Sequence, residues 1–288
     1  MKVSRKNKIL FHKVVLSVLC TLLGVALFFV IGILMASDII AAEAKNPKEN
    51  MECDFCEETV RAVLEEERIE KEAERAKKLA EARGIIYLTF DDGPGDYTNT
   101  LLDTLDKYEV KATFFVTGRG DDATIKREYD EGHTVALHTW SHNYAYIYSS
   151  VGNYFADLQQ IADRVKNITG TDAKLIRFPG GSSNLVSRRY DGRSKIMSTL
   201  TREVEARGYQ YFDWNVDSDD AGRADNPDTV YNNIVSRLKD GPNVILQHDI
   251  KPYSVEAVER VIQYGNENNF VFEPLKVDSF TAHHGVNN

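Results

Sequence analysis

Short β-prone runs alternate with amphipathic helical patterns from residue 85 to near the C-terminus, and this alternation restricts the fold more than any other feature. The predicted strands are 85–90, 112–116, 134–137, 175–178, 209–214, 243–246 and 270–274, and the predicted helices are 98–108, 123–131, 153–168, 195–207, 229–238 and 254–266. Strands that alternate with helices favour parallel pairing, with the helices as crossovers. We therefore predict an α/β domain over residues 85–288, built as a barrel or a doubly wound sheet.

An apolar run without charged residues, 14–37, precedes this domain. As a helix it would extend about 35 Å, which is enough for a hydrocarbon core of about 30 Å. Basic residues precede the run (Lys2, Arg5, Lys6, Lys8 and Lys13), and Asp38 and Glu43 follow it. The positive-inside rule predicts a cytoplasmic basic tail at 1–13, a transmembrane signal anchor at 14–37 and an extracellular remainder. The predicted location is thus the cell membrane, with a single pass.

A cleaved signal peptide is the alternative for the same segment. Ala42-Glu43-Ala44 has the small-x-small pattern of a cleavage site. The apolar part of a signal peptide usually runs about 7–15 residues, and this run is longer, which favours the uncleaved anchor. Cleavage would make the protein secreted, so both interpretations place the rest of the chain outside the membrane.

Residues 38–84 are predicted to form a charged helical stalk. The stretch 57–83 is rich in Glu, Ala, Lys, Arg and Leu and has no Gly or Pro, and opposite charges lie four apart, as in Glu67 and Lys71. Gly84 is predicted to end the helix. A solvated spacer is favoured, while oligomerisation through the stalk as a coiled coil stays open.

Cys53 and Cys56 form a Cys-x-x-Cys pair near the start of the stalk. Two cysteines cannot complete a structural zinc site, which needs about four ligands. A local or intermolecular disulfide stays open for an exported chain.

The chain is acidic, with a formal net charge of -9. A protein that binds duplex nucleic acid needs a basic face to meet the phosphates. We therefore expect no nucleic-acid partner.

Acids and histidines follow the predicted strands of the first half. Asp91 and Asp92 come after the first strand, and His138 and His142 come after the third. Histidines at i and i+4 would share one face of a helical turn, within reach of one metal ion. Asp92, His138 and His142 make a three-ligand set that leaves positions open for water and substrate, as catalytic zinc sites do.

Further polar groups follow later strands. Arg177 precedes Pro179-Gly180-Gly181, where a guanidinium can orient a carboxylate and a glycine-rich turn can expose backbone N–H groups. An acidic cluster occupies 213–220, and His248 ends the penultimate strand. Turn formation, structural ion pairs and chance surface histidines remain alternatives for each group taken alone.

Five segments in this order resemble the motifs of the NodB-like polysaccharide deacetylases, carbohydrate esterase family four. They are TFDDGP (89–94), HTWSH (138–142), RFPGG (177–181), DWNVDSDD (213–220) and LQH (246–248). The resemblance covers about residues 85–275. It implies a distorted (β/α)7-type barrel, preceded here by the transmembrane helix and the charged stalk. It also implies a divalent metal, usually Zn2+, with Co2+, Mn2+ and Ni2+ as alternatives.

The resemblance implies a role for each motif residue. Asp91 corresponds to the general base, with Arg177 orienting it, and His248 to the general acid, with Asp220 tuning it. The implied metal ligands are Asp92, His138 and His142. The Gly180 N–H corresponds to an oxyanion donor, and Leu246 to part of the acetyl pocket.

Two positions depart from the family pattern. Gly180 stands where the family often has an aromatic residue, and Ala221 stands where it often has tryptophan. Stacking on sugar could come instead from neighbouring aromatic residues, with core packing as the alternative: Trp140, Tyr144, Tyr146 and Tyr148.

The predicted function is a metal-dependent hydrolase that removes N-acetyl groups from GlcNAc-type residues of an extracellular polysaccharide, with peptidoglycan as the favoured substrate. The alternatives are a deacetylase of chitin-like or exopolysaccharide poly-GlcNAc, an O-acetyl esterase, and a non-catalytic glycan-binding protein.

Overall fold

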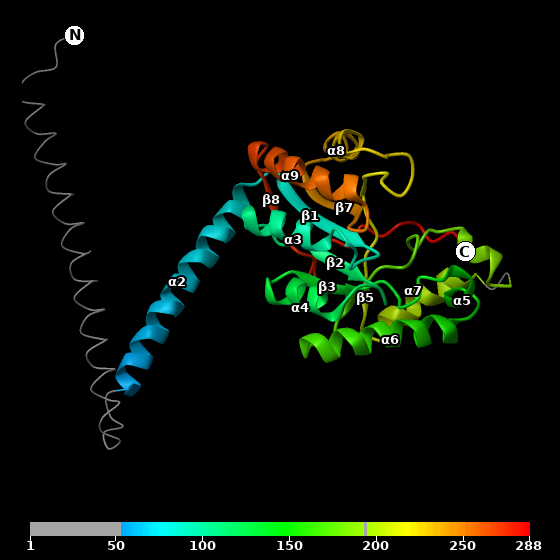
Figure 1. Ribbon diagram of the computed structural model, residues 1–288, viewed down its shortest axis with the longest axis horizontal. Helices are drawn as coiled ribbons and strands as arrows, with labels where there is room; N and C mark the ends of the chain where they lie inside the picture. Colours follow the sequence, from blue (N-terminus) through cyan, green and yellow to red (C-terminus); the bar gives the residue numbers. More distant parts are fainter. Residues whose placement is uncertain (1–52, 193–194) are drawn as a thin grey trace, which may run out of the picture. The chain divides into compact units, whose positions relative to one another are not determined.

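The computed structural model describes residues 53–192 and 195–288 (Figure 1). The predicted tail at 1–13, the anchor at 14–37 and the first part of the stalk lie outside these residues. Within the described part, no helix has the length and apolar character needed to cross a membrane. Residues 74–288 form one compact unit that contains every described strand.

The predicted stalk helix is present as α2, Cys53–Glu81. Its described side chains are exposed, and Arg68 pairs with Glu65 and Glu72 at 2.5 and 2.6 Å along the helix surface. Oligomerisation through α2 stays a prediction, and a disulfide of Cys53 and Cys56 falls on side chains outside the described part.

The prediction that Gly84 ends this helix is wrong, because α2 ends at Glu81 and Gly84 is the first residue of β1. A Cβ at Gly84 would collide with the Gly241 carbonyl oxygen on the neighbouring strand. The glycine is needed for strand pairing, which the local helix pattern does not reveal.

All the described strands belong to one parallel sheet. They are β1 (Gly84–Asp91), β2 (Thr113–Val116), β3 (Thr134–Leu137), β4 (Leu175–Ile176), β5 (Gln210–Tyr211), β6 (Val216–Asp217), β7 (Gly241–His248) and β8 (Phe270–Phe272). The order is β5-β4-β3-β2-β1-β7-β6, and β8 pairs with the first residues of β1. The sheet curls into a half-barrel, which agrees with the predicted distorted (β/α)7-type barrel.

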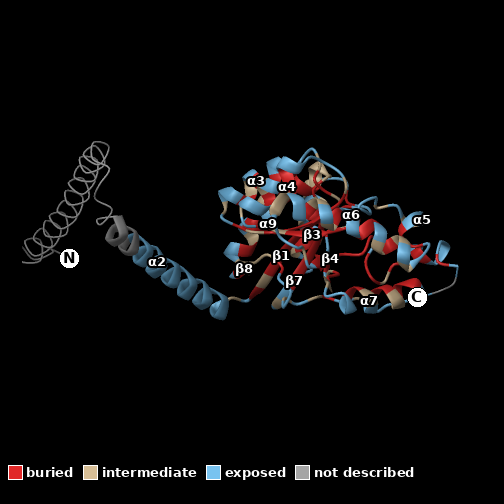
Figure 2. Ribbon diagram, turned by 90° about the horizontal axis from the view of Figure 1, so that it is seen from below, coloured by how far each residue is buried: buried red, intermediate tan, exposed pale blue. Residues whose placement is uncertain are grey.

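Helices cover the outer face of the sheet, so that buried strands lie beneath exposed helix surfaces (Figure 2). They are α3 (Thr98–Lys107), α4 (Asp122–Asp130), α5 (Tyr144–Ile147), α6 (Val151–Thr169), α7 (Ile196–Ala206), α8 (Pro227–Val235) and α9 (Pro252–Glu267), with a 3-10 turn at Val186–Arg189. The Ser150 and Asn226 side chains cap the N-termini of α6 and α8. Gly170, with φ of 73°, ends α6 in the left-handed conformation.

The period of two along each strand separates an outer core from an inner one. On β1, Ile86, Leu88 and Phe90 belong to the large core beneath the helices, whereas Tyr87 belongs to a smaller core with Phe115, Phe212 and Val244 inside the curl. Thr89 and Asp91 lie two and four residues after Tyr87, so their side chains point to the same inner face. The strand therefore delivers polar side chains to the inner face at its carboxyl end.

The C-terminal segment lies beside the open side of the curl, near the end of β5. Asp213 N donates to Thr281 O at 3.1 Å, and the His283 ring stacks on Tyr211 with 3.7 Å between ring centres. Asn288 O accepts hydrogen bonds from Ser198 N and Oγ at 2.7 and 2.6 Å. The tail thus packs where the sheet itself does not close.

Candidate active site

The carboxyl ends of β1 and β7 set the centre of the site. In the parallel register, Asp91 pairs with His248 and Thr89 pairs with Leu246. Paired residues on adjacent parallel strands point to the same face, so all four side chains lie on the inner side. Two neighbouring strands therefore supply both predicted proton-transfer residues.

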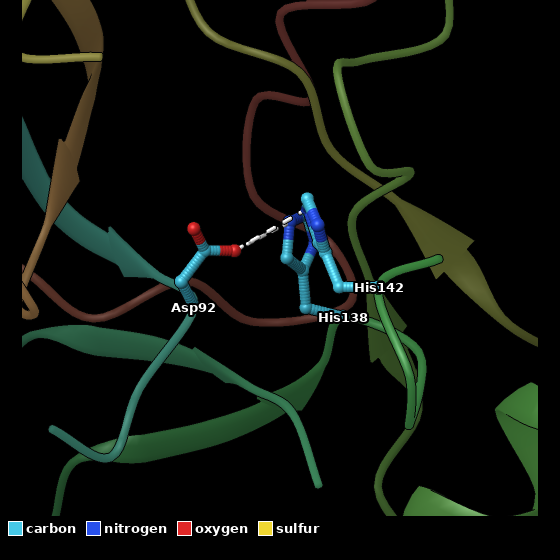
Figure 3. Close-up of side chains that lie close together, drawn as sticks. All are labelled: Asp92, His138 and His142. Carbon is cyan, nitrogen blue, oxygen red and sulfur yellow. Dashed lines mark ion pairs between the residues drawn. The ribbon is translucent and has the colours of Figure 1, made fainter. Parts of the chain in front are cut away.

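The three predicted metal ligands come together as one cluster (Figure 3). Asp92 Oδ1 lies 3.3 Å from His142 Nε2 and 3.6 Å from His138 Nε2, and the three ligand atoms lie within 4.8 Å of one another. Tetrahedral coordination with bonds of about 2.0–2.1 Å places ligand atoms about 3.3 Å apart. The buried Asp92 Oδ1 has no hydrogen-bond partner among the described residues, so a cation fits this donor set.

The two histidines meet without a helical turn, so the prediction that they share a helix face is wrong. Residues 138–142 form an irregular loop in which Thr139 and His142 adopt φ of 63° and 50°. Asp157, buried on α6, accepts hydrogen bonds from Trp140 N and Ser141 N at 2.6 and 3.0 Å. These bonds hold the loop in a conformation that residues of this kind rarely adopt alone.

The histidines are arranged for ligation. His138 Nδ1 lies 2.8 Å from the carbonyl oxygen of Arg177, so a proton on Nδ1 leaves the Nε2 lone pair free for a metal. Burial and the neighbouring His138 lower the pKa of His142 to about 4, against the opposing charge of Asp92. Burial acts to raise the pKa of Asp92, but the two histidines outweigh it and the pKa is lowered. At neutral pH both His142 and Asp92 are therefore ready to bind a cation.

Arg177 is completely buried and fixes Asp91. Its Nη1 donates to Asp91 Oδ1 and to Thr89 Oγ1, both at 2.7 Å. Its other nitrogens donate to the Phe212 and Asp213 carbonyl oxygens at 3.1 and 3.0 Å. With Oδ1 held in this way, Asp91 Oδ2 is the oxygen nearer the histidine cluster, 3.7 Å from His138 Nε2.

His248 is held by the other predicted partner, Asp220. Asp220 Oδ1 lies 2.7 Å from His248 Nδ1, and Asp220 Oδ2 accepts from His248 N at 2.7 Å. Burial acts to lower the pKa of His248, but the hydrogen bond and charge of Asp220 outweigh it and raise the pKa to about 9. Burial acts to raise the pKa of Asp220, but the hydrogen bond and charge of His248 outweigh it and the pKa of Asp220 is lowered. His248 is thus an imidazolium at neutral pH.

The loop after β4 presents Gly180 to the site. Gly180 is exposed with φ of 76°, and no described residue accepts a hydrogen bond from its N–H. The buried Asp213 carboxylate anchors the loop through Ser182 N and Oγ at 2.8 and 2.5 Å, and it also accepts from His284 N at 2.9 Å. The tail therefore supports the loop that carries the predicted oxyanion donor.

The aromatic residues near the site divide into three kinds. Tyr148 is fully buried and donates to Pro179 O at 2.7 Å, so core packing is its role. Trp140 and Tyr146 are exposed by 37% and 41% and remain available for sugar. Tyr144 is half-buried, with its ring edge-on to His142.

Several residues that support the site are not among those predicted from the sequence. Asp157 interrupts the apolar pattern of its helix beside Phe155 and Leu158, and an acidic residue at such a position indicates a structural or functional role. The two-residue strand β6 lies within the predicted acidic cluster and separates Asp213 from Asp220. A strand of two residues is too short to show the alternation of apolar and polar side chains that predicts a strand.

Comparison with protein families and known proteins places the chain among deacetylases. A family model described as polysaccharide deacetylase matches residues 78–195. A peptidoglycan-N-acetylglucosamine deacetylase of Bacillus cereus is 34% identical over 205 residues, which are 68% of this chain and 71% of the relative. A chitin deacetylase of Arthroderma benhamiae is 35% identical over 61% of this chain and 46% of the relative.

Solved structures agree with this similarity. The catalytic domain of a peptidoglycan N-acetylglucosamine deacetylase from Eubacterium rectale is 50% identical and superposes with a TM-score of 0.68. The match covers 71% of this chain and 94% of that domain.

Proposed function

The chain belongs to the polysaccharide deacetylase family and is an enzyme of that kind, and we propose that it removes N-acetyl groups from N-acetylglucosamine residues of peptidoglycan. One observation carries this proposal: the Asp92–His138–His142 cluster lies beside Asp91 and His248, the paired ends of β1 and β7. The similarity to peptidoglycan deacetylases of Bacillus cereus and Eubacterium rectale supports the choice of substrate.

We propose that Asp92, His138 and His142 hold a divalent cation, with Zn2+ as the first choice. Two imidazoles and one carboxylate suit zinc, and Co2+, Mn2+ and Ni2+ are alternatives. A bound cation would polarise the acetyl carbonyl and make water easier to deprotonate.

The side chains around the cluster supply the proton transfers. Asp91 is the general base: Arg177 fixes Oδ1, and the second oxygen takes a proton from the attacking water. Water oxygen then bonds to the acetyl carbon, and the carbonyl becomes an oxyanion that the Gly180 N–H stabilises.

His248 completes the reaction as the general acid. The imidazolium gives its proton to the amide nitrogen as the C–N bond breaks, so acetate and a free amine leave. Leu246 lies on β7 two residues before His248, on the same inner face, and is 7% exposed. Its side chain offers an apolar wall for the acetyl methyl group.

The basic limb of the pH–rate profile should report His248. Its imidazolium, with a pKa of about 9, is the working form, so kcat/KM should fall as the pH rises through that value. Asp220→Asn removes the charge that raises the pKa while burial still lowers it, so the limb should move to about 6.5 or below. A bound cation would lower the pKa of His248 in the wild type and in Asp220→Asn alike. The difference in the basic-limb pKa between the two proteins is therefore the quantity to measure. An unchanged limb in Asp220→Asn would contradict the assignment.

The proposed substrate requires an exported site. Residues 14–37 are uncharged and apolar with bases before them, which supports a membrane anchor with the catalytic part outside. We propose that residues 38–84 act as a spacer between the membrane and the catalytic part.

Muropeptide analysis tests substrate and location together. Cells that carry the full chain should contain muropeptides lacking one acetyl group on glucosamine, and cells without it should lose them. A chain that starts at residue 47 lacks the segment predicted to direct export and should leave the wall acetylated. Unchanged muropeptides in cells with the full chain would contradict the proposal.

Chitin-like glycan is the second candidate, supported by the chitin deacetylase of Arthroderma benhamiae. Acetate release from chitin oligomers but not from purified peptidoglycan would favour it. Acetate release without a new free amine would instead indicate an O-acetyl esterase.

A further inference from the structure

The Tyr144 side chain occupies the space beside the oxyanion loop. A Cβ built on Gly180 would lie 3.0 Å from the Tyr144 hydroxyl oxygen and 3.4 Å from its Cε1. The phenol comes from the first residue of α5 and reaches the space that a side chain at position 180 would fill. Because Gly180 has no side chain, the Tyr144 hydroxyl can lie next to the backbone that carries the proposed oxyanion donor.

The Tyr144 ring is held in place by its neighbours. Its centre is 5.3 Å from the His142 ring, edge-on at 86°, and 5.7 Å from the Tyr148 ring. Tyr148 is itself fixed by its hydrogen bond to Pro179 O, next to Gly180. The phenol therefore lies between a proposed metal ligand and the oxyanion loop, packed against the rings of His142 and Tyr148.

The Tyr144 hydroxyl is free to bind a ligand. No hydrogen bond joins it to another residue within 53–192 or 195–288. The Tyr148 hydroxyl is already used, and Tyr146 is 41% exposed on the same short helix. Of these three tyrosines, Tyr144 is the one whose donor both adjoins Gly180 and lacks an acceptor among the described residues.

We propose that Tyr144 is a further catalytic residue, whose hydroxyl donates a hydrogen bond to the acetyl carbonyl oxygen beside the Gly180 N–H. This inference rests on the proposed deacetylation. The phenol keeps its proton throughout: the water proton goes to Asp91, the proton of His248 goes to nitrogen, and Tyr144 only stabilises charge on the carbonyl oxygen. A donor aimed at an oxyanion acts more strongly in the transition state than in the bound substrate.

Tyr144→Phe tests the assignment, with Tyr129→Phe as the matched control, because Tyr129 is 38% exposed on α4 and lies toward the end of the sheet opposite the site. Loss of one side-chain oxyanion donor costs about 10²–10³ in kcat, and the Gly180 N–H remains, so we expect a fall of roughly 10- to 100-fold. KM, zinc content and the melting temperature should stay at wild-type values, because the hydroxyl binds no group in the part of the chain that the structure describes. Tyr129→Phe should keep the wild-type kcat.

Acetate binding gives a readout that does not depend on the glycan. Calorimetric titration of the zinc-loaded chain with acetate should show several-fold weaker binding in Tyr144→Phe, because a carboxylate oxygen takes the place of the acetyl oxygen. A wild-type kcat in Tyr144→Phe, or a change in KM alone, would overturn the inference. If the wild-type chain released no acetate from any glycan, the proposed function would fail, while equal acetate affinity in both proteins would overturn the role of Tyr144.

Discussion

Asp91→Asn will lower kcat by about 10²–10⁴-fold, the usual contribution of a positioned general base, while zinc binding is retained. Asparagine has nearly the shape of aspartate and still offers an oxygen to Arg177 Nη1, 2.7 Å away in the structure. It cannot accept the proton of the attacking water. The zinc content of the variant separates a base from a metal ligand, because Asp92, His138 and His142 are untouched.

The stability of Asp91→Asn has to be measured separately from its activity. Arg177 is fully buried, and removal of the charge it faces leaves a buried guanidinium less well compensated. We therefore expect a lower melting temperature and propose that kcat be expressed per zinc-loaded chain. Asp96→Asn, at an exposed position on the same loop, should match the wild type in both properties. A wild-type kcat in Asp91→Asn, or loss of zinc together with activity, would contradict the assignment.

The parts of the fold that repeat were predictable from the sequence. The alternation of strand and helix patterns between 85 and 274 predicted parallel pairing of the strands, because apolar side chains recur with periods of two and 3.6 wherever one face is buried. The same logic placed Asp91 and His248 at strand ends, where β1 and β7 bring them into register.

The parts that depend on distant residues were not predictable. The left-handed conformations of Thr139 and His142 are sustained by Asp157 from α6, so the local sequence, which favoured a helical turn, was misleading. The tail that packs beside β5 has no periodicity, and its contact with Asp213 is a matter of tertiary structure. The Tyr144–Gly180 contact likewise joins the start of α5 to the loop after β4, and sequence spacing does not reveal that contact.

Metal removal carries the largest expected effect, because all three ligands converge on one point. The Asp92 Oδ1 distances of 3.3 and 3.6 Å to the two Nε2 atoms suit zinc, and Asp92 Oδ1 has no described hydrogen-bond partner. A cation held by these residues would polarise the acetyl carbonyl, and its removal would take that charge away. Turnover should therefore be lost in the stripped chain and recover with about one zinc per chain, whereas His142→Ala should need far more zinc.

The most direct test measures acetate and free amine together, on peptidoglycan glycan strands, before and after chelation. We predict equal amounts of the two products from the zinc-loaded chain, neither product from the stripped chain, and full recovery when zinc is restored. Turnover that survives complete removal of the metal, or acetate released without an equal amount of amine, would contradict the central claim that this cluster supports hydrolysis of an N-acetyl group.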